Sequence, residues 1–289
     1  QAQLDFPHLF DDSQINLTAF SAQSSWRAIS GKPGHYDISV DKLSFTNQDF
    51  TGDGSGHWQT TIDGTLPTAM DLSLNLKTAK VDSVWRYLPR TVSNETRTWI
   101  KQSLRGGTLT GVKLLLKGNL VDYPFRGGKG GTFVVSGNFA DTNLDYADYW
   151  PPIAGLSGEI LFASETMRIR ANSGSVFGAS LKDVTAELPD LEANEQILTV
   201  KGRAAGPTAD FMHFIDTSPV KKSIDNAIED MQATGSGELD LKLVIPLSTE
   251  APAQVDGTFR FFANQVVIGK GIPPLTDLNG RIKFTANSR

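Results

Sequence analysis

The chain has 289 residues, no cysteine and a formal net charge of −5 at neutral pH. This length can bury a sizeable core, and a hydrophobic fraction of 39% excludes wholesale disorder. Net acidity with scattered Lys and Arg argues against a nucleic-acid partner, the lack of cysteine excludes disulfides and thiol chemistry, and no apolar run is long enough for a membrane helix. The sequence starts with QAQLDF and stops at IKFTANSR in mid-pattern, so we expect a piece of a longer protein.

Alternation of apolar and polar residues dominates the sequence and predicts strands with one apolar side. Strands with this pattern are predicted over 14–20, 35–46, 56–62, 71–77, 110–116, 133–139, 158–163, 166–171, 181–188, 196–204, 238–247, 259–261 and 279–285. The Gly-rich stretches at 52–56, 126–131 and 171–175 are predicted to be turns.

Helical periodicity occurs first in 82–104. Asp82 is a candidate cap of a short turn that Pro89 ends, and Ser93 is expected to cap a second helix. Large aromatic side chains at strand–helix junctions are expected to pin the helices to the sheet; they are Trp85, Trp99 and Trp150.

The second helical stretch is 208–232. A short helix is expected to carry Phe211, Phe214 and Ile215, and Ser218 is expected to cap another one with Pro219 at its first position. That helix would present an apolar stripe made of Val220, Ile224, Ala227, Ile228 and Met231.

An internal repeat links the two helical stretches. The matches are Gly131-Thr132-Phe133 with 257–259, 151–152 with 273–274, and 158–162 with 280–284. They define a unit of about 125 residues, of which the chain holds about 2.3 copies. The predicted division is 1–80 as a partial unit, 81–207 as a unit with its helix pair, and 208–289 as a partial unit with a helix pair.

So few helices cannot cover a sheet of about a dozen strands. The sheet must therefore close on itself, sandwich a second sheet, or leave an apolar face lining a channel. Tandem repetition favours stacked neighbours, so we predict a mainly β fold with an elongated, curved antiparallel sheet. Alternation by itself fits an ordinary packed sandwich core equally well.

A set of motifs spread over two hundred residues resembles one known family. These motifs are WRYLP at 85–89, LRGG at 104–107, LDY at 144–146, WPP at 150–152, and FIDTSP at 214–219. They are similar to the AsmA-like domain of the YhdP-type proteins, relatives of AsmA and TamB in Gram-negative bacteria. The resemblance covers roughly residues 70–289 and extends more loosely over the first 70.

The resemblance implies a repeating β-groove, a U-shaped trough that is apolar inside and polar outside. It also implies a periplasmic segment of an inner-membrane-anchored protein that bridges towards the outer membrane and conducts phospholipid acyl chains. On this basis we expect no enzymatic activity, cofactor or metal, and leave the oligomeric state open. Two alternatives remain: a periplasmic scaffold or outer-membrane assembly factor without lipid conduction, and a polysaccharide-acting or polysaccharide-binding β-protein.

The side chains expected to line the groove are the apolar members of the alternating strands. They are Leu72, Leu74, Leu76, Val112, Leu114, Leu116, Phe133, Val135, Phe139, Leu239, Leu241, Leu243, Phe259 and Phe261. Thr110 is expected on the same face as Val112, because the two positions are two residues apart.

Other motifs give weaker signals for chemistry. Ser218 and Lys221 have the spacing of a serine acyl-enzyme motif without its companion motifs, and Asp49 with Asp53 forms a fragment of a calcium loop. The 126–131 segment resembles a phosphate loop but lacks the following Ser or Thr. The histidines lack metal-ligand spacing; they are His8, His35, His57 and His213.

Overall fold

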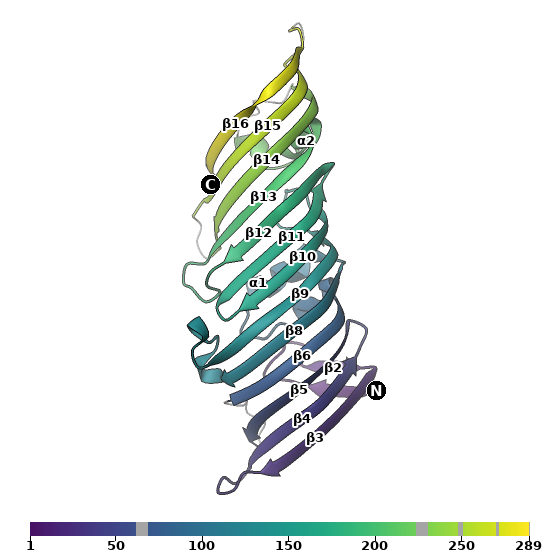
Figure 1. The fold of residues 1–289 in the computed structure, drawn as a ribbon, viewed down its shortest axis with the longest axis vertical. Coiled ribbons are helices and arrows are strands. Elements are labelled where there is room, and N and C mark those ends of the chain that lie inside the picture. Colours follow the sequence, from purple (N-terminus) through teal and green to yellow (C-terminus); the bar gives the residue numbers. More distant parts are fainter. Residues whose placement is uncertain (62–68, 224–230, 248–250, 270–271, 289) are drawn as a thin grey trace. The chain divides into compact units, whose positions relative to one another are not determined.

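The computed structural model describes residues 1–61, 69–223, 231–247, 251–269 and 272–288. Long antiparallel strands dominate these residues and helices are few and short (Figure 1), which confirms the predicted fold class. The strands are β1 (Ala2–Asp5), β2 (Gln14–Leu17), β3 (Ala19–Ala28), β4 (His35–Thr46), β5 (Phe50–Thr61), β6 (Ala69–Lys80), β7 (Leu104–Arg105), β8 (Thr108–Asn119), β9 (Gly131–Leu144), β10 (Ile153–Ala163), β11 (Thr166–Val176), β12 (Ala179–Leu188), β13 (Ile197–Pro207), β14 (Gln232–Pro246), β15 (Ala253–Val267) and β16 (Leu275–Ser288).

Strands that follow one another along the chain are also neighbours in the sheet. The order runs from β3 through β4, β5, β6 and β8 to β16 in sequence, and β7 adds a short pairing with β9. β1 and β2 form a separate two-stranded sheet. Most consecutive strands are joined directly, and each such connection returns the chain beside the strand it has just left. The connections from β6 to β8 and from β13 to β14 contain the helical segments instead.

The chain forms two compact units. The first comprises Gln1–Ala140 with Glu159–Met167, and the second comprises Asp141–Gly158 with Arg168–Arg289. Both have a long strand, then a helical segment, then two long strands: β6 is followed by helices, β8 and β9, and β13 by helices, β14 and β15. The repeated order fits the sequence repeat, while the division at residues 80 and 207 stays a prediction.

The helical segment of the first unit consists of η1 (Val81–Tyr87), a 3₁₀ helix, and α1 (Asn94–Ser103). Ser93 Oγ accepts a hydrogen bond from the Thr96 amide at 3.2 Å, which confirms the predicted cap. The cap predicted at Asp82 is wrong, because η1 begins directly at the end of β6 and Asp82 lies inside its first turn.

The helical segment of the second unit consists of α2 (Thr208–Asp216) and α3 (Val220–Ser223). The short helix predicted around Phe211 is therefore confirmed. Ser218 Oγ accepts from the Val220 amide at 3.4 Å, as expected of a residue that caps α3. Of the rest of the predicted apolar stripe, Ile224, Ala227 and Ile228 lie outside the described residues. Met231 is described and precedes β14 without helical structure, so the prediction of a helix up to 232 is wrong at its end.

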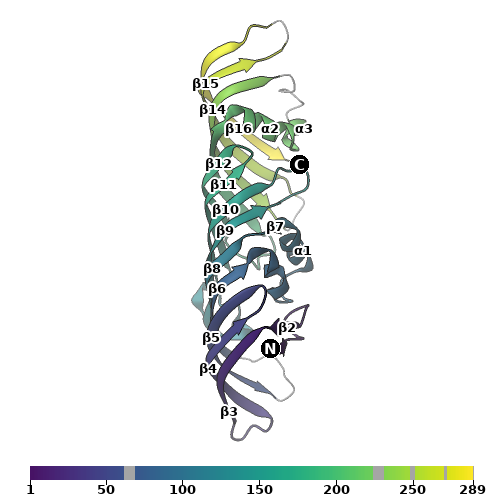
Figure 2. The same cartoon turned by 90° about the vertical axis from the view of Figure 1, so that its right-hand side faces the viewer.

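The buried core of the first unit lies where the helical segment meets the sheet. Ala79, Val81, Leu109 and Val112 are its buried residues. The partly buried side chains packed against them come from strands and from the helical segment; they are Phe50, Leu76, Val84, Leu104, Val135, Phe139 and Ile160. Figure 2 shows α1 and β7 on one side of the strands β5 to β8, so the helical segment covers one end of one face of the sheet.

Two of the predicted turns are wrong, because 52–56 lies inside β5 and 171–175 lies inside β11. The glycines in these strands provide room for neighbouring side chains. A Cβ on Gly52 would stand 2.8 Å from the Phe45 ring, and one on Gly54 would stand 2.6 Å from a Leu74 methyl group. The third predicted turn, 126–131, does connect β8 to β9.

A β-bulge in β8 changes the face of Thr110. The register of β8 against β9 shifts between Thr110 and Lys113, where Gly111 has a φ of 58°. One extra residue reverses the side of every position before it. Leu109, paired with Phe139, therefore lies on the apolar face and is 8% exposed, whereas Thr110 is on the opposite face, contrary to the prediction.

The lack of space for a side chain at Gly158 allows a test of close strand packing. A Cβ on Gly158 would overlap the Arg170 carbonyl oxygen and stand 2.8 Å from the Ala171 Cα, so backbone would have to move. We expect Gly158→Ala to lower the free energy of unfolding by about 1–3 kcal/mol. Gly269→Ala is the control because a Cβ there meets nothing within 4 Å. Equal urea unfolding curves for both variants would contradict this account.

Candidate functional site

Large apolar side chains form rows in register across the first unit. In β6, Leu72 and Leu74 pair with Leu116 and Leu114 of β8. The same two β8 residues pair with Phe133 and Val135 of β9. Directly paired residues in a sheet point to the same side. The first apolar face is therefore made of Leu72, Leu74, Leu76, Val112, Leu114, Leu116, Phe133, Val135 and Phe139.

The second unit carries a similar face. Leu239 of β14 pairs with Phe259 of β15 and with Ala204 of β13. Phe261 lies opposite Gly237, on the same side. The second apolar face is made of Leu239, Leu241, Leu243, Phe259 and Phe261. All fourteen residues predicted from the alternation thus fall on these two faces, although a role in lining a groove stays a prediction.

Helical segments cover part of each face. Val112 is 7% exposed and belongs to the buried core, and Leu76, Val135 and Phe139 pack against that core. In the second unit, the rings of Phe211 of α2 and Phe259 lie 5.0 Å apart. The other predicted residues are only half-buried. Each face therefore has a covered end and a stretch with its apolar side chains partly accessible.

The opposite side of the sheet is polar and held by cross-strand ion pairs. Lys117 of β8 lies 2.6 Å from Asp71 of β6, and Lys77 lies 3.6 Å from Asp53 of β5. In the second unit, Arg260 lies 2.7 Å from Asp240. Each exposed pair of this kind contributes little stability. Together, these charged side chains keep this side of the sheet hydrated.

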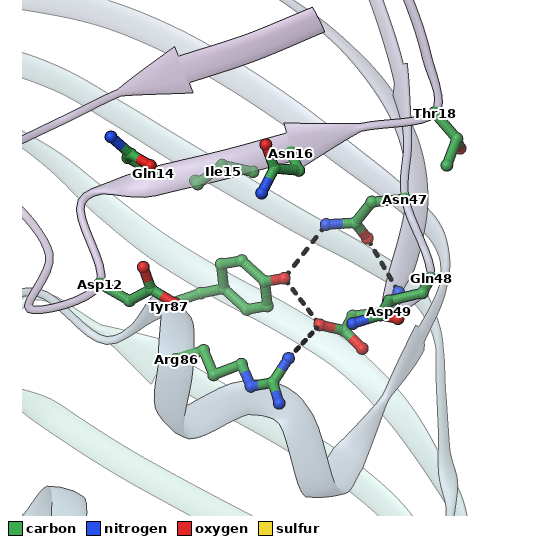
Figure 3. Close-up of a pocket in the computed structure, with 10 residues that line it drawn as sticks. All are labelled: Asp12, Gln14, Ile15, Asn16, Thr18, Asn47, Gln48, Asp49, Arg86 and Tyr87. Atoms are coloured by element: carbon green, nitrogen blue, oxygen red, sulfur yellow. Dashed lines mark hydrogen bonds and ion pairs between the residues drawn. The ribbon is translucent and has the colours of Figure 1, made fainter. Parts of the chain in front are cut away.

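A polar pocket of about 330 Å³ lies in the first unit between the β1–β2 sheet, the β4–β5 turn and η1 (Figure 3). Asp49 is its centre and is 6% exposed. Its carboxylate accepts hydrogen bonds from the Tyr87 hydroxyl at 2.8 Å, the Ser83 hydroxyl at 3.1 Å and the Arg86 guanidinium at 3.3 Å. The Asn47 amide donates to the Tyr87 oxygen at 3.1 Å.

Burial, and then the hydrogen bond to Asp49, raises the pKa of Tyr87 to about 12. The phenol therefore stays protonated and donates to the carboxylate. The network fastens η1 to the β4–β5 turn across 38 residues of sequence. Sequence patterns missed it, and the only local signal was that Arg86 and Tyr87 lie within the WRYLP motif.

The weaker chemical motifs have structural roles. Asp49 belongs to the Tyr87 network while Asp53 pairs with Lys77, so the calcium-like spacing does not gather its ligands. Ser218 Oγ donates to the Ile215 carbonyl and Lys221 pairs with Asp216 at 3.4 Å. Among the described residues, no group of three or more His, Asp or Glu could hold a metal ion.

The three tryptophans differ in their packing. The rings of Trp150 and Phe214 of α2 lie 5.8 Å apart and are tilted by 49°, a contact expected of a residue that anchors a helix. Trp85 carries the Lys101 ammonium over its ring at 4.2 Å. Trp99 leaves 47% of its surface in solvent.

Together, the register and the polarity define a β-sheet protein in which each of the two units has a polar side and an apolar side that short helices cover only in part. The chain belongs to the YhdP protein family, which it matches over residues 1–288, and this confirms the resemblance seen in the motifs. It is similar to the intermembrane phospholipid transporter YhdP of Escherichia coli (strain K12), with 23% identity over 206 residues. That match covers 69% of this chain and 16% of the relative's length.

No solved structure is similar at a significant level. No helix among the described residues is long and apolar enough to cross a membrane.

The raised pKa of Tyr87 predicts an alkaline loss of stability. Its folded pKa of about 12 lies above the reference value of 10.0. The folded state therefore holds the proton more tightly, and this stabilisation is complete below pH 10 and lost as pH rises to about 12. Between pH 10 and about 12, the parent chain should lose about 1 kcal/mol of unfolding free energy that Tyr87→Phe does not lose. This value allows for solvent screening, and urea unfolding at each pH measures it.

The matched control is Tyr149→Phe, since 87% of Tyr149 is exposed. Tyr146, whose pKa burial also raises to about 12, keeps its contribution in both variants. Identical alkaline profiles for Tyr87→Phe and the parent chain would show that the network does not hold the proton.

Proposed function

We propose that this chain is a segment of an intermembrane phospholipid transporter and that its two apolar faces guide acyl chains through the periplasm. The observation that carries the proposal is the set of half-buried leucine and phenylalanine side chains in register on one side of the sheet. The ion pairs on the other side support a surface that faces water. The similarity to a protein named as an intermembrane phospholipid transporter adds the lipid class.

The energetic need for such a surface is large. Burial of hydrocarbon is worth about 0.8 kcal/mol for each CH₂ group, so two chains of about sixteen carbons need roughly 25 kcal/mol of shielding. A sheet face supplies van der Waals contact along the whole chain, while the charged head group stays in water. To keep the acyl chains on protein and the head group in water, the surface must be apolar and open to solvent along its length, and a closed pocket would not serve.

Movement along the faces requires that no position holds a lipid too strongly. Leu72 pairs with Leu116, and the next row pairs Leu74 with Leu114, so successive rows present similar side chains. Gly54 and Gly56 of β5 lie opposite Leu74 and Leu72, which leaves the surface shallow there. Contacts of nearly equal strength let an acyl chain slide from row to row.

Two rivals make different predictions. A periplasmic scaffold or outer-membrane assembly factor would carry the same sheet without a lipid on it. A polysaccharide-acting or polysaccharide-binding protein would present aromatic rings and free carboxylates in a polar cleft. In the polar pocket, the Tyr87 hydroxyl and the Asp49 carboxylate bond each other, which does not favour that use. We infer a transport role without catalysis.

Cross-linking from adjacent positions of β8 tests the proposal in the full-length protein in its membranes. Leu114 lies on the first apolar face, and Leu115 lies on the opposite side with 39% of its surface exposed. A photoreactive phenylalanine analogue at position 114 should form adducts that mass spectrometry identifies as phospholipid. The same analogue at position 115 should form far fewer. Equal or absent adducts at both positions would favour the scaffold.

A charge on the apolar face should block passage. An unpaired carboxylate disfavours contact with hydrocarbon by several kcal/mol, so Leu114→Asp and Leu241→Asp should each reduce lipid transfer between the membranes by about tenfold or more. Leu115→Asp is the matched control because it adds the same charge on the polar side. Normal transfer in both face variants, with the proteins folded and present at normal levels, would overturn the role of these residues.

A further inference from the structure

A cavity of about 460 Å³ in the first unit lies next to the first apolar face, and its charged lining residues are mainly cations. The end of β6, η1, the last turn of α1 and β7 form its walls. Four basic side chains converge there: Lys80, Arg86, Lys101 and Arg105. Only two carboxylates, Asp49 and Asp82, share the walls.

The charges in this cationic cavity do not cancel. Asp49 is buried and already accepts hydrogen bonds from Tyr87 and Ser83 in addition to Arg86. Lys80 lies 4.0 Å from the same carboxylate. Within the described part of the chain, no carboxylate lies at ion-pair distance from Lys101 or Arg105. Two cations therefore remain available to an anion.

Trp85 lies against two of the four basic side chains, Lys101 and Arg86. The Lys101 ammonium lies 4.2 Å from the ring centroid and the Arg86 guanidinium lies 5.5 Å from it. A cation over an aromatic face is attracted by the ring and loses some of its freedom. The lysine is thus positioned before a ligand arrives, which lowers the entropy lost on binding.

The cavity also touches hydrocarbon. Leu104 borders it and packs against the buried core that contains Val112, a residue of the first apolar face. A ligand that bears an anion and an acyl chain could place the anion among the cations while its chain follows the strands. An anion without a chain would use only the polar part.

We infer that the cationic cavity binds a phosphate group, with Lys101 and Arg105 as its principal partners. Arginine offers a planar set of N–H donors that matches phosphate oxygens, and lysine adds a compact charge. Lys80 and Arg86 raise the local positive potential. A phospholipid head group and free inorganic phosphate carry the same group, and the head group as the source rests on the proposed transport function.

Protection of Lys101 from amine acetylation tests this inference on the purified, lipid-depleted full-length protein. Three probes are compared: short-chain phosphatidylglycerol, inorganic phosphate, and a diacylglycerol with the same chains but no phosphate. Peptide mass spectrometry gives the acetylation rates of Lys101 and of Lys113, an exposed lysine on the polar side of β8. Phosphatidylglycerol should slow the reaction at Lys101 by about fivefold or more relative to Lys113, and the diacylglycerol should not.

Arg105→Gln supplies the second measurement because it leaves the reporter lysine intact. It should remove most of the protection at Lys101, whereas Arg170→Gln, at an exposed arginine of β11, should not. Protection by inorganic phosphate at the same concentration would support the site with the free anion as ligand. Protection only by phosphatidylglycerol would support the head group. No protection by either phosphate compound, or protection that survives Arg105→Gln, would overturn the inference.

The outcomes of this experiment and of the cross-linking from position 114 are independent. Lipid adducts at position 114 without protection of Lys101 would leave the acyl-chain path standing and remove the phosphate site. Protection of Lys101 by inorganic phosphate without lipid adducts at position 114 would leave the phosphate site and remove the transport function.

Discussion

The alternation of side chains along a β-strand is the constraint on which this fold depends. Backbone hydrogen bonds fix neighbouring strands in register, and the period of two then sends every second side chain to the same side. Leu72, Leu116 and Phe133 meet in one row because of that register. The cross-strand pair of Asp71 and Lys117 is the consequence on the other side. A sheet built in this way is amphipathic, and its apolar side must be shielded from water.

The helical segments provide only part of that cover, and polar contacts decide where they sit. In the first unit, Val84 and Leu104 seal one end of the apolar face. The Asp49 network holds η1 against the β4–β5 turn, so the helices have a fixed place at the end of the strands. The same arrangement gathers Lys101 and Arg105 beside Leu104. The contacts that hold the helical segment on the sheet therefore also form the cationic cavity beside the first apolar face.

The sequence predicts the parts of this structure that depend on local rules. Alternation locates most strands, and the Ser93 cap follows from the preference of helix starts for serine. The errors arise where distant residues decide. Glycines at 52–56 read as a turn because nothing local shows that Phe45 and Leu74 occupy the space above them. One bulge residue in β8 moved Thr110 to the other side. The link from Asp49 to Tyr87 spans 38 residues and leaves no periodic trace.

The glycines and the bulge also bear on the proposed function, because they shape the apolar surface. In β5, glycines face Leu72 and Leu74, so leucine side chains of one strand lie across the backbone of the next. This packing fills gaps without forming deep pockets. A binding pocket gains affinity by enclosing its ligand, whereas a surface that moves a ligand must hold it with similar strength at each step. Even rows of leucine and phenylalanine fit the second requirement, and the cationic cavity at the covered end of the first apolar face is where we infer that an amphipathic ligand is oriented.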